Sequence, residues 1–285
     1  MDKSNQKSTL LPILDIGNFQ ANNLEGLCIL DHSIEGKSKI DPPHKHDFFL
    51  FFLIEKGGGY HRIDFTSYPV SNKQLHILNP GQVHDWELDQ KTRGYQLMIG
   101  KNEFEEMGGI LYFLSLYQVK SPVLQLLDEE FMIFHHEFLQ ILNESKLPKP
   151  DKGIVRFRCN IIIKLIIREI EKITTQHHRP LIPELLLKYL SDIDEFYKKE
   201  KSMVFYAEKL NITPNYLNII CKKHLGKTAY SLIKSRISLE AKRLLSISNI
   251  TVKELAFELG FQDPANFSKF FREETGTSPS DFRSK

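Results

Sequence analysis

The sequence predicts two domains of different class: a mainly-β barrel with flanking helices, then an all-α domain with two helix-turn-helix motifs. The 285 residues are enough for two domains, each with its own core. Short apolar strands separated by turn signals occupy residues 27–100. Two copies of one helix-turn-helix pattern, offset by fifty positions, occupy the carboxy-terminal part of the chain.

Charge is divided unevenly along the chain. The 41% of hydrophobic and 26% of charged residues are ordinary for a globular protein. Residues 1–200 hold 24 Lys and Arg against 28 Asp and Glu, whereas residues 201–285 hold 14 against 8. A basic carboxy-terminal part is typical of a domain that meets phosphate, but an excess of this size is also a common surface charge. Charge alone therefore leaves DNA binding and an ordinary surface equally open.

No segment predicts export or membrane insertion. The first residues, Met1–Gln6, lack the apolar stretch of a secretory signal, and the longest apolar run, Phe48–Ile54, is far shorter than a membrane span. We therefore expect a cytoplasmic protein without membrane contact. The three cysteines fit a reducing compartment, because they are scattered and have neither a disulfide framework nor a metal spacing: Cys28, Cys159 and Cys221.

The two copies of the repeat predict the same helices. In each copy a short helix and a turn precede a second helix that begins at a proline and ends at a glycine. Thr213 predicts the cap of the first of these second helices, before Pro214, and Thr251 with Glu254 predicts a capping box in the second copy. The matched positions are Leu217 with Phe267, Cys221 with Phe271 and Gly226 with Gly276.

Each second helix also predicts an exposed stripe that suits a major groove. Asn pairs with adenine, Lys reaches guanine acceptors, and an aliphatic side chain packs on a thymine methyl group. The alternative is that the stripes are solvated helix faces, but the joint repetition of caps and stripes disfavours it. The candidate base-reading residues are Asn215, Asn218, Ile219, Asn266, Ser268 and Lys269. The candidate phosphate contacts are Lys222, Lys223, Lys227, Arg272 and Arg283.

A continuous helical pattern from Thr228 to Leu245 separates the two copies. Its eighteen residues span roughly 27 Å. Two recognition helices on one face of DNA lie about 34 Å apart. A spacer helix of this length therefore suits two consecutive major grooves.

The carboxy-terminal residues resemble the AraC/XylS family of bacterial transcription regulators over about residues 190–283. The motifs that carry the resemblance include Ala207-x-x-Leu210, Arg236-x-x-x-x-Ala241, Gly260-Phe261-x-Asp263, Phe267-x-x-x-Phe271 and Gly276-x-Ser278-Pro279. Ile219 stands where the family often has a polar or basic base-reader, which leaves the specificity of the first helix open. A second departure, at Ile220 and Cys221, affects only packing. The resemblance implies a sequence-specific regulator whose partners are promoter DNA and, for an activator, RNA polymerase.

The amino-terminal strands predict a closed or sandwiched sheet structure. Strands are expected at Phe48–Glu55, Tyr60–Phe65, Gln74–Leu78 and Tyr95–Ile99, with turns between them. The first of these strands is apolar on both faces, so we expect it to be covered on both sides. Pro43-His44-x-His46-Asp47-Phe48, Gly57-Gly-Gly-Tyr60 and Pro80-Gly-Gln-Val-His84 resemble the cupin-like sensor domain that the same regulator family carries.

This second resemblance raises two expectations for the barrel. Cupin enzymes hold iron or manganese through spaced histidines and a Glu about four residues after the second histidine, where this chain has Leu50 and Phe51. We therefore expect no metal and no cofactor. The barrel is expected to hold a small effector, the alternative being that its own side chains fill it. The candidate lining residues are His44, His46, Tyr60, His84, Trp86 and Tyr95.

Two further helices are expected between the strands and the repeat, at Asp128–Glu144 and Gly153–Thr175. In the family such helices pair two subunits, and packing on the barrel is an equal alternative. Pro180 and Pro183 close an expected linker. The expected domains are residues 1–175 for effector binding and dimerisation, 176–183 for the linker and 184–285 for DNA binding.

The leading functional hypothesis is a homodimeric transcription regulator that responds to an effector and is not an enzyme. One alternative is a cupin-type metalloenzyme with a DNA-binding tail, which requires a metal. The other is a DNA-binding regulator with an inert barrel, which predicts that no small molecule changes its DNA affinity or thermal stability.

Overall fold

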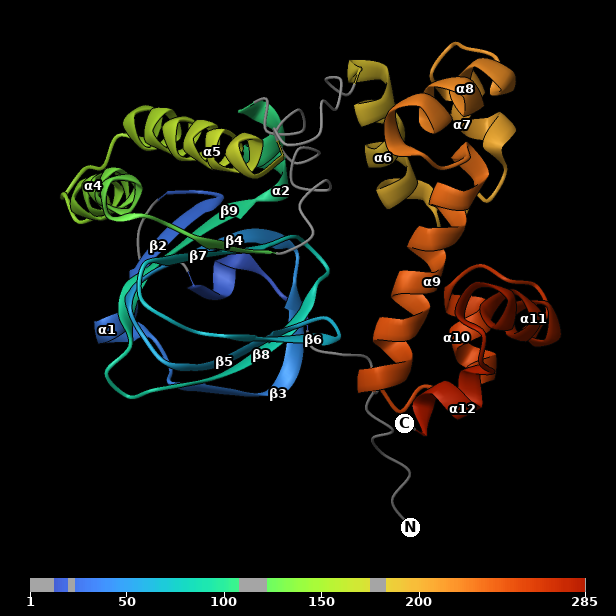
Figure 1. Cartoon of the computed structure of the whole chain (residues 1–285), viewed down its shortest axis with the longest axis horizontal. Coiled ribbons are helices and arrows are strands. Elements are labelled where there is room, and N and C mark those ends of the chain that lie inside the picture. Colours follow the sequence, from blue (N-terminus) through green and yellow to red (C-terminus); the bar gives the residue numbers. More distant parts are fainter. Residues whose placement is uncertain (1–12, 20–23, 108–121, 175–182, 285) are drawn as a thin grey trace. The chain divides into compact units, whose positions relative to one another are not determined.

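The computed structural model describes residues 13–19, 24–107, 122–174 and 183–284, and contacts divide the chain into two compact units, residues 12–178 and 179–285. Figure 1 draws the first unit as sheets with its long helices on one side and the second as helices alone. These classes confirm the predicted fold. The predicted linker, 176–183, lies almost entirely outside the described residues.

Two five-stranded sheets form the amino-terminal unit. One sheet has the order β1-β3-β8-β5-β6 and the other β10-β7-β4-β9-β2. All the pairings are antiparallel except that of β1 with β3. The strands are β1 (Ile13–Leu14), β2 (Leu27–Asp31), β3 (Lys39–His46), β4 (Phe48–Lys56), β5 (Gly59–Ile63), β6 (Thr66–Pro69), β7 (Gln74–Leu78), β8 (Val83–Leu88), β9 (Arg93–Gly100) and β10 (Val123–Gln125).

Strand β4 separates two hydrophobic cores, as its apolar sequence predicted. Because successive side chains point to opposite faces, Phe48 and Phe52 enter the core between the sheets, whereas Phe49 and Phe51 enter the core under the helices. The helix-side core also contains Phe134 and many other aliphatic and aromatic side chains. Both faces of this strand are therefore dry, which explains its lack of polar alternation.

Helices cover the outer face of the second sheet (Figure 1). The two long ones, α4 (Asp128–Ser145) and α5 (Lys152–Thr174), were predicted almost to the residue, and they pack against each other. The chain also has η1 (Ile16–Phe19), α1 (His32–Glu35) and α2 (Lys101–Glu106). Within the described residues, every helix is too short or too polar to cross a membrane.

The carboxy-terminal unit consists of seven helices within the described residues 183–284. Helix α9 (Ala229–Ile247) connects the two motifs and is about 28 Å long at 1.5 Å per residue. The other helices are α6 (Glu184–Phe196), α7 (Met203–Lys209), α8 (Pro214–Leu225), α10 (Val252–Glu258), α11 (Pro264–Thr275) and α12 (Pro279–Arg283). The helical spacing of Leu185, Leu186, Tyr189, Leu190, Ile193 and Tyr197 predicts a helix over 184–201, but α6 ends at Phe196 and the residues after Tyr197 form a loop.

Candidate DNA-binding surface and barrel interior

The two helix-turn-helix motifs are α7 with α8 and α10 with α11, and they are built alike. The Thr213 side chain caps α8 by accepting from the Tyr216 amide at 3.2 Å, and the Asp263 side chain caps α11 by accepting from the Ala265 amide at 3.0 Å. Both helices end at a left-handed glycine, Gly226 or Gly276. The predicted capping box of α10 is also present.

The predicted matches between the copies are structural equivalents. Leu217 and Phe267 are fully buried, and so are Cys221 and Phe271 one helical turn later. In the preceding helices, Ala207 and Ala256 are fully buried as well. A side chain as small as Ala at this crossing lets the second helix of each motif approach the first closely.

The predicted base-reading residues divide into two groups. Asn215, Ile219, Asn266 and Lys269 are exposed. The other two are half-buried and engaged within the domain: Asn218 Oδ1 accepts from the Ala229 amide at 3.1 Å, and Ser268 Oγ donates to the Pro264 carbonyl at 2.9 Å. Tyr216, which sequence reasoning passed over, is 49% exposed beside Asn215.

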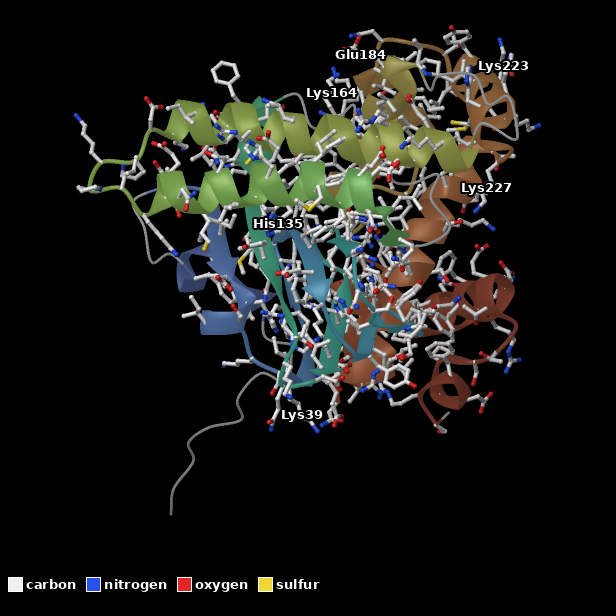
Figure 2. The ribbon with its side chains drawn as sticks, turned by 60° about the vertical axis from the view of Figure 1, so that its left-hand side comes forward. Lys39, His135, Lys164, Glu184, Lys223 and Lys227 are labelled. Atoms are coloured by element: carbon white, nitrogen blue, oxygen red, sulfur yellow. The ribbon has the colours of Figure 1, made fainter. Side chains whose placement is uncertain are left out.

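Four of the five predicted phosphate contacts are exposed. Lys222, Lys223 and Lys227 lie at the carboxyl end of α8, where Figure 2 labels Lys223 and Lys227. Arg272 lies on α11 and, with Lys269, lines an open hollow of about 500 Å³. The fifth, Arg283, is half-buried, and its Nη2 donates to the Ile250 carbonyl, which makes it an internal contact of this domain.

Four of the six predicted lining residues of the barrel point inward. His44, His46, His84 and Trp86 are at most 6% exposed, and the Trp86 indole donates to the Lys37 carbonyl at 2.8 Å.

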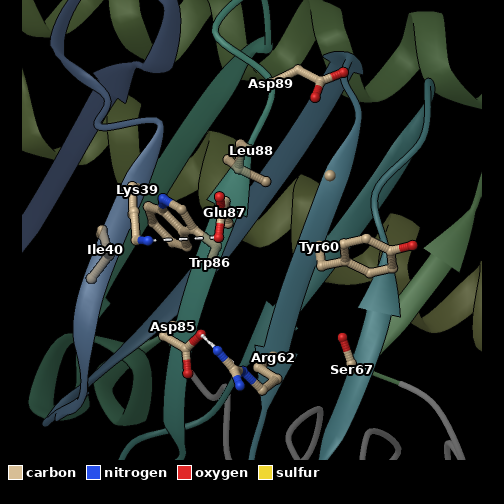
Figure 3. Close-up of a pocket in the computed structure, with 11 residues that line it drawn as sticks. Lys39, Ile40, Tyr60, Arg62, Ser67, Asp85, Trp86, Glu87, Leu88 and Asp89 are labelled. Carbon is tan, nitrogen blue, oxygen red and sulfur yellow. Dashed lines mark hydrogen bonds and ion pairs between the residues drawn. The ribbon is translucent and has the colours of Figure 1, made fainter.

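The two tyrosines point elsewhere. Tyr60 is 61% exposed, and together with Arg62 it lines an outer hollow of about 650 Å³ (Figure 3). Tyr95 faces the helices, where its hydroxyl lies 3.4 Å from His135 Nε2. The physical reason is strand alternation, which directs the neighbours of these residues, His61 and Gln96, into the interior instead.

A chain of hydrogen-bonded imidazoles crosses the barrel interior. His76 Nε2 lies 3.1 Å from Gln74 Oε1, His76 Nδ1 lies 2.9 Å from His61 Nδ1, and His61 Nε2 lies 3.1 Å from His84 Nδ1. Sequence reasoning missed His61 and His76. The available signal for His61 was the apolar Ile63 two positions later, because alternate side chains of a strand share a face, but the pairing of these strands could not be read from the sequence.

The tautomers of these hydrogen-bonded imidazoles follow from Gln74 Oε1, the first acceptor in the series. Gln74 Oε1 only accepts, so His76 Nε2 carries the proton and His76 Nδ1 accepts from His61. By the same rule His84 Nδ1 donates to His61, which leaves His84 Nε2 without a proton. His46 Nδ1 donates to the Phe48 carbonyl at 2.7 Å, which leaves His46 Nε2 in the same state. Both Nε2 atoms are buried and have no hydrogen-bond partner among the described residues.

Burial keeps these imidazoles neutral. Desolvation lowers the pKa of His46 to about 4 and that of His76 to about 3. Desolvation, with the repulsion of neighbouring histidines, lowers the pKa of His61 and of His84 well below the ordinary value. The interior therefore offers unprotonated acceptor nitrogens and no charge at neutral pH.

The imidazoles do not form the metal centre that a cupin fold suggests. Leu50, at the position expected for the carboxylate ligand, is buried and apolar. Within the described ranges, no group of three or more His, Cys, Asp or Glu side chains converges as metal ligands do. The interior residues therefore do not fit the metal site of that fold.

Comparisons with known proteins assign both units. Residues 35–148 match the family described as an AraC-like ligand binding domain, and residues 206–285 match a helix-turn-helix domain family. The HTH-type transcriptional activator RhaS of Salmonella schwarzengrund (strain CVM19633) is 24% identical over 254 residues, which cover 85% of this chain and 87% of RhaS. RhaS of Escherichia coli O139:H28 (strain E24377A / ETEC) has the same identity and coverage.

Among solved structures, ToxT from Vibrio cholerae is 14% identical with a TM-score of 0.40, covering 90% of this chain and 97% of ToxT. The DNA-binding domain of AdpA in complex with a target DNA is 22% identical with a TM-score of 0.34, covering 36% and 92%. Because an AraC-like ligand binding domain precedes a tandem helix-turn-helix domain, and because RhaS matches along most of both chains, the chain belongs to the AraC family of DNA-binding transcription regulators.

Proposed function

We propose that each protomer reads a directional DNA sequence that spans two successive major grooves. The observation that carries this proposal is the pair of equivalent helices, α8 and α11, which share their caps and buried positions but expose different side chains. Asn215, Tyr216 and Ile219 would read one half-site, and Asn266 and Lys269 the other. Because the two sets differ, the preferred DNA would not be palindromic.

The lysines and Arg272 would set the register on the phosphates. Lys222 and Lys223 in the last turn of α8 and Lys227 just after it are all exposed, so their charges are available to DNA. We assign Asn218 and Ser268 a secondary part, since each already makes a hydrogen bond within the domain. Arg283 is left out of the interface for the same reason.

A binding assay with two single variants tests this assignment. Selection of bound genomic fragments by the purified protein first supplies the site. Lys269→Ala is then expected to lower affinity for that site by about 1–3 kcal/mol and to relax the preference at one position. Lys222→Ala should weaken binding to all sequences and reduce the salt dependence by about one counterion. A uniform loss with Lys269→Ala would contradict the base-reading role.

The barrel interior would bind an effector that brings hydrogen-bond donors. The unpartnered Nε2 atoms of His46 and His84 are acceptors in an apolar core, and leaving a buried polar atom unpaired costs about 1–3 kcal/mol. A hydroxyl or amine of a ligand would satisfy them. A panel of small molecules should therefore contain one that raises the thermal midpoint of the barrel and changes DNA affinity. An inert barrel predicts neither effect.

Helix α5 would join two subunits into a homodimer. Its outer face exposes Ile154, Phe157 and Ile161 at helical spacing, and Phe157 is 75% exposed. Sedimentation of the purified protein should show a dimer that Phe157→Glu weakens, whereas Ile34→Glu, at the 74% exposed position on α1, should leave it unchanged. If the Phe157→Glu protein sediments like the wild type, the dimer contact lies elsewhere.

The cellular role would be activation in the cytoplasm. The matched relatives are named as transcriptional activators. We extend this to the present chain as a protein without enzymatic activity that recruits RNA polymerase to the promoter it binds. Transcription of the selected promoter in a purified system should rise when the protein is added, and a fall would identify a repressor instead.

A further inference from the structure

We propose that a contact between the two helix-turn-helix motifs fixes their relative position, so that the protein recognises its two half-sites only at one spacing. The contact joins the loop after α6 to the turn between α10 and α11. We call it the inter-motif clamp, and it consists of Lys198, Lys201, Glu258, Gly260 and Phe261. The inference rests on the proposed use of both motifs and adds a determinant of DNA spacing to it.

Lys201 forms the centre of the clamp. Its Nζ donates to the Lys198 carbonyl at 3.1 Å in its own loop and to the Gly260 carbonyl at 3.0 Å in the second motif. The same ammonium lies 4.9 Å from the centroid of the Phe261 ring. Next to it, Lys198 Nζ and Glu258 Oε1 form an ion pair at 2.5 Å. Two lysines of one loop thus bind the second motif at three points.

Gly260 brings the two backbones together. Its φ is +73°, and a Cβ at this position would lie 1.8 Å from the Lys198 carbonyl oxygen. Any other residue would therefore force the loop and the turn apart. The contact is between backbone groups, so no change of side-chain rotamer relieves the clash.

The first motif shows that this glycine is not needed for the turn itself. Asn211 holds the equivalent position, with φ +54°. The turns also share their hydrogen bonds, since the Ile212 amide donates to Ala207 and the Phe261 amide donates to Ala256. Asn suffices in the first turn because Asn tolerates the left-handed conformation. The second turn has Gly at the point where the Lys198 carbonyl approaches. The glycine is therefore required by the clamp and not by the conformation of the turn.

The clamp forms a second connection between the motifs, in addition to α9. The loop belongs to the first motif's side, because the Tyr206 hydroxyl of α7 donates to the Glu200 carbonyl at 2.9 Å. Arg236 of α9 donates to Asp194 of α6 at 2.5 Å and lies 4.1 Å from the Tyr197 ring centroid. The end of α6 is thus fixed both to the connecting helix and to the second motif. If α9 were the single connection, bending or twisting of this helix would move one motif relative to the other. A second connection through the clamp restrains both motions.

The restraint has a direct counterpart in DNA geometry. One base pair adds about 3.4 Å and about 35° between two half-sites. A clamped domain cannot follow such a change without losing contacts at one site. A domain held by α9 alone would adapt.

The test measures affinity of the full-length protein for its selected DNA site and for versions with one base pair removed or inserted between the half-sites. The wild type is expected to lose about tenfold in affinity per altered spacing, comparable to a mismatched base pair. Lys201→Met and Gly260→Asn should bind the original spacing more weakly and lose no more than about threefold on the altered ones. Affinity for a single half-site should stay at the wild-type value.

Two matched controls isolate the clamp. Lys199→Met removes the same charge from an exposed neighbour in the loop. Gly226→Asn makes the same exchange at φ +67°, where an added Cβ meets no described atom within 4 Å. Both should keep the sharp spacing profile. Because Lys201→Met leaves the backbone intact, it decides the question even if Gly260→Asn folds poorly.

Clamp variants with the same spacing profile as the wild type would overturn the inference while leaving two-motif recognition in place. A wild type that is indifferent to spacing would overturn it together with the proposed use of both motifs. A sharp profile in the wild type that flattens only in the clamp variants would establish it.

Discussion

Mild acid should destabilise the amino-terminal domain. The imidazoles of His46, His61, His76 and His84 are buried and neutral, and the pKa of each lies below its ordinary value. In the unfolded chain the same groups take up protons below about pH 6.5. The unfolded state then binds more protons than the folded state, so stability is complete above this pH and falls as the pH falls below it.

The size of the effect follows from the shifts. For His46, with a folded pKa of about 4, lowering the pH from 7.5 to 5.5 costs about 1.4 kcal/mol of the free energy of unfolding. His76, with a folded pKa of about 3, costs about the same, and the lowered pKa values of His61 and His84 add to the loss in the same direction. For a domain of this size the two quantified groups alone should lower the thermal midpoint by roughly 5–10 °C.

The assay uses a reporter that the sequence provides. Trp86 is the single tryptophan, and its ring centroid lies 5.3 Å from that of His61. Tryptophan fluorescence therefore follows the barrel alone. The described part of the helical domain contains one histidine, His224, so its melting, followed by circular dichroism, should change less.

One variant checks the cause of the acid effect. His76→Asn should lower stability at pH 7.5 but make the pH dependence shallower by one proton. A Trp86 melting midpoint that is the same at pH 7.5 and pH 5.5 would refute the reasoning.

Three further predictions concern the helical domain. Arg283→Ala should destabilise this domain by about 1–3 kcal/mol, because the Ile250 carbonyl loses its donor. The variant should leave the salt dependence of DNA binding unchanged. A weaker salt dependence would show that Arg283 does contact phosphate. Asn218→Ala should lower the melting temperature through the lost bond to the Ala229 amide, whereas Asn215→Ala should lower DNA affinity at unchanged stability. Thr251→Ala should cost about 1 kcal/mol in a denaturant titration through the lost capping box, and an unchanged midpoint would contradict that role.

The helical domain could be predicted closely because its signals are local. A cap, a proline at the first helical position and a terminal glycine lie within one helix, as with Thr213, Pro214 and Gly226. The buried stripe of α8 follows from the same periodicity. The end of α6 could not be predicted, because the loop after Tyr197 is held by Lys201 contacts to residues about sixty positions away.

The barrel site was harder for a related reason. A strand's side chains change face at every residue, so the choice of Tyr60 rather than His61 reversed the side of the sheet. The expectation of inward-facing histidines was correct for His44, His46 and His84, which belong to the sequence motifs and are buried. The link through His61 and His76 depends on three strands that meet only in the folded sheets.

The repeat also shows why duplicated motifs need not be interchangeable. Both turns need one residue with positive φ, and Asn211 meets that need in the first copy. Gly260 meets an additional one, since the Lys198 carbonyl occupies the space of its missing Cβ. The two copies thus differ in the residues exposed on α8 and α11 and also in the residues through which the motifs contact each other. Recognition of two independent half-sites would use only the first difference. The second difference fixes the motifs against each other, as the proposed recognition of half-site spacing requires.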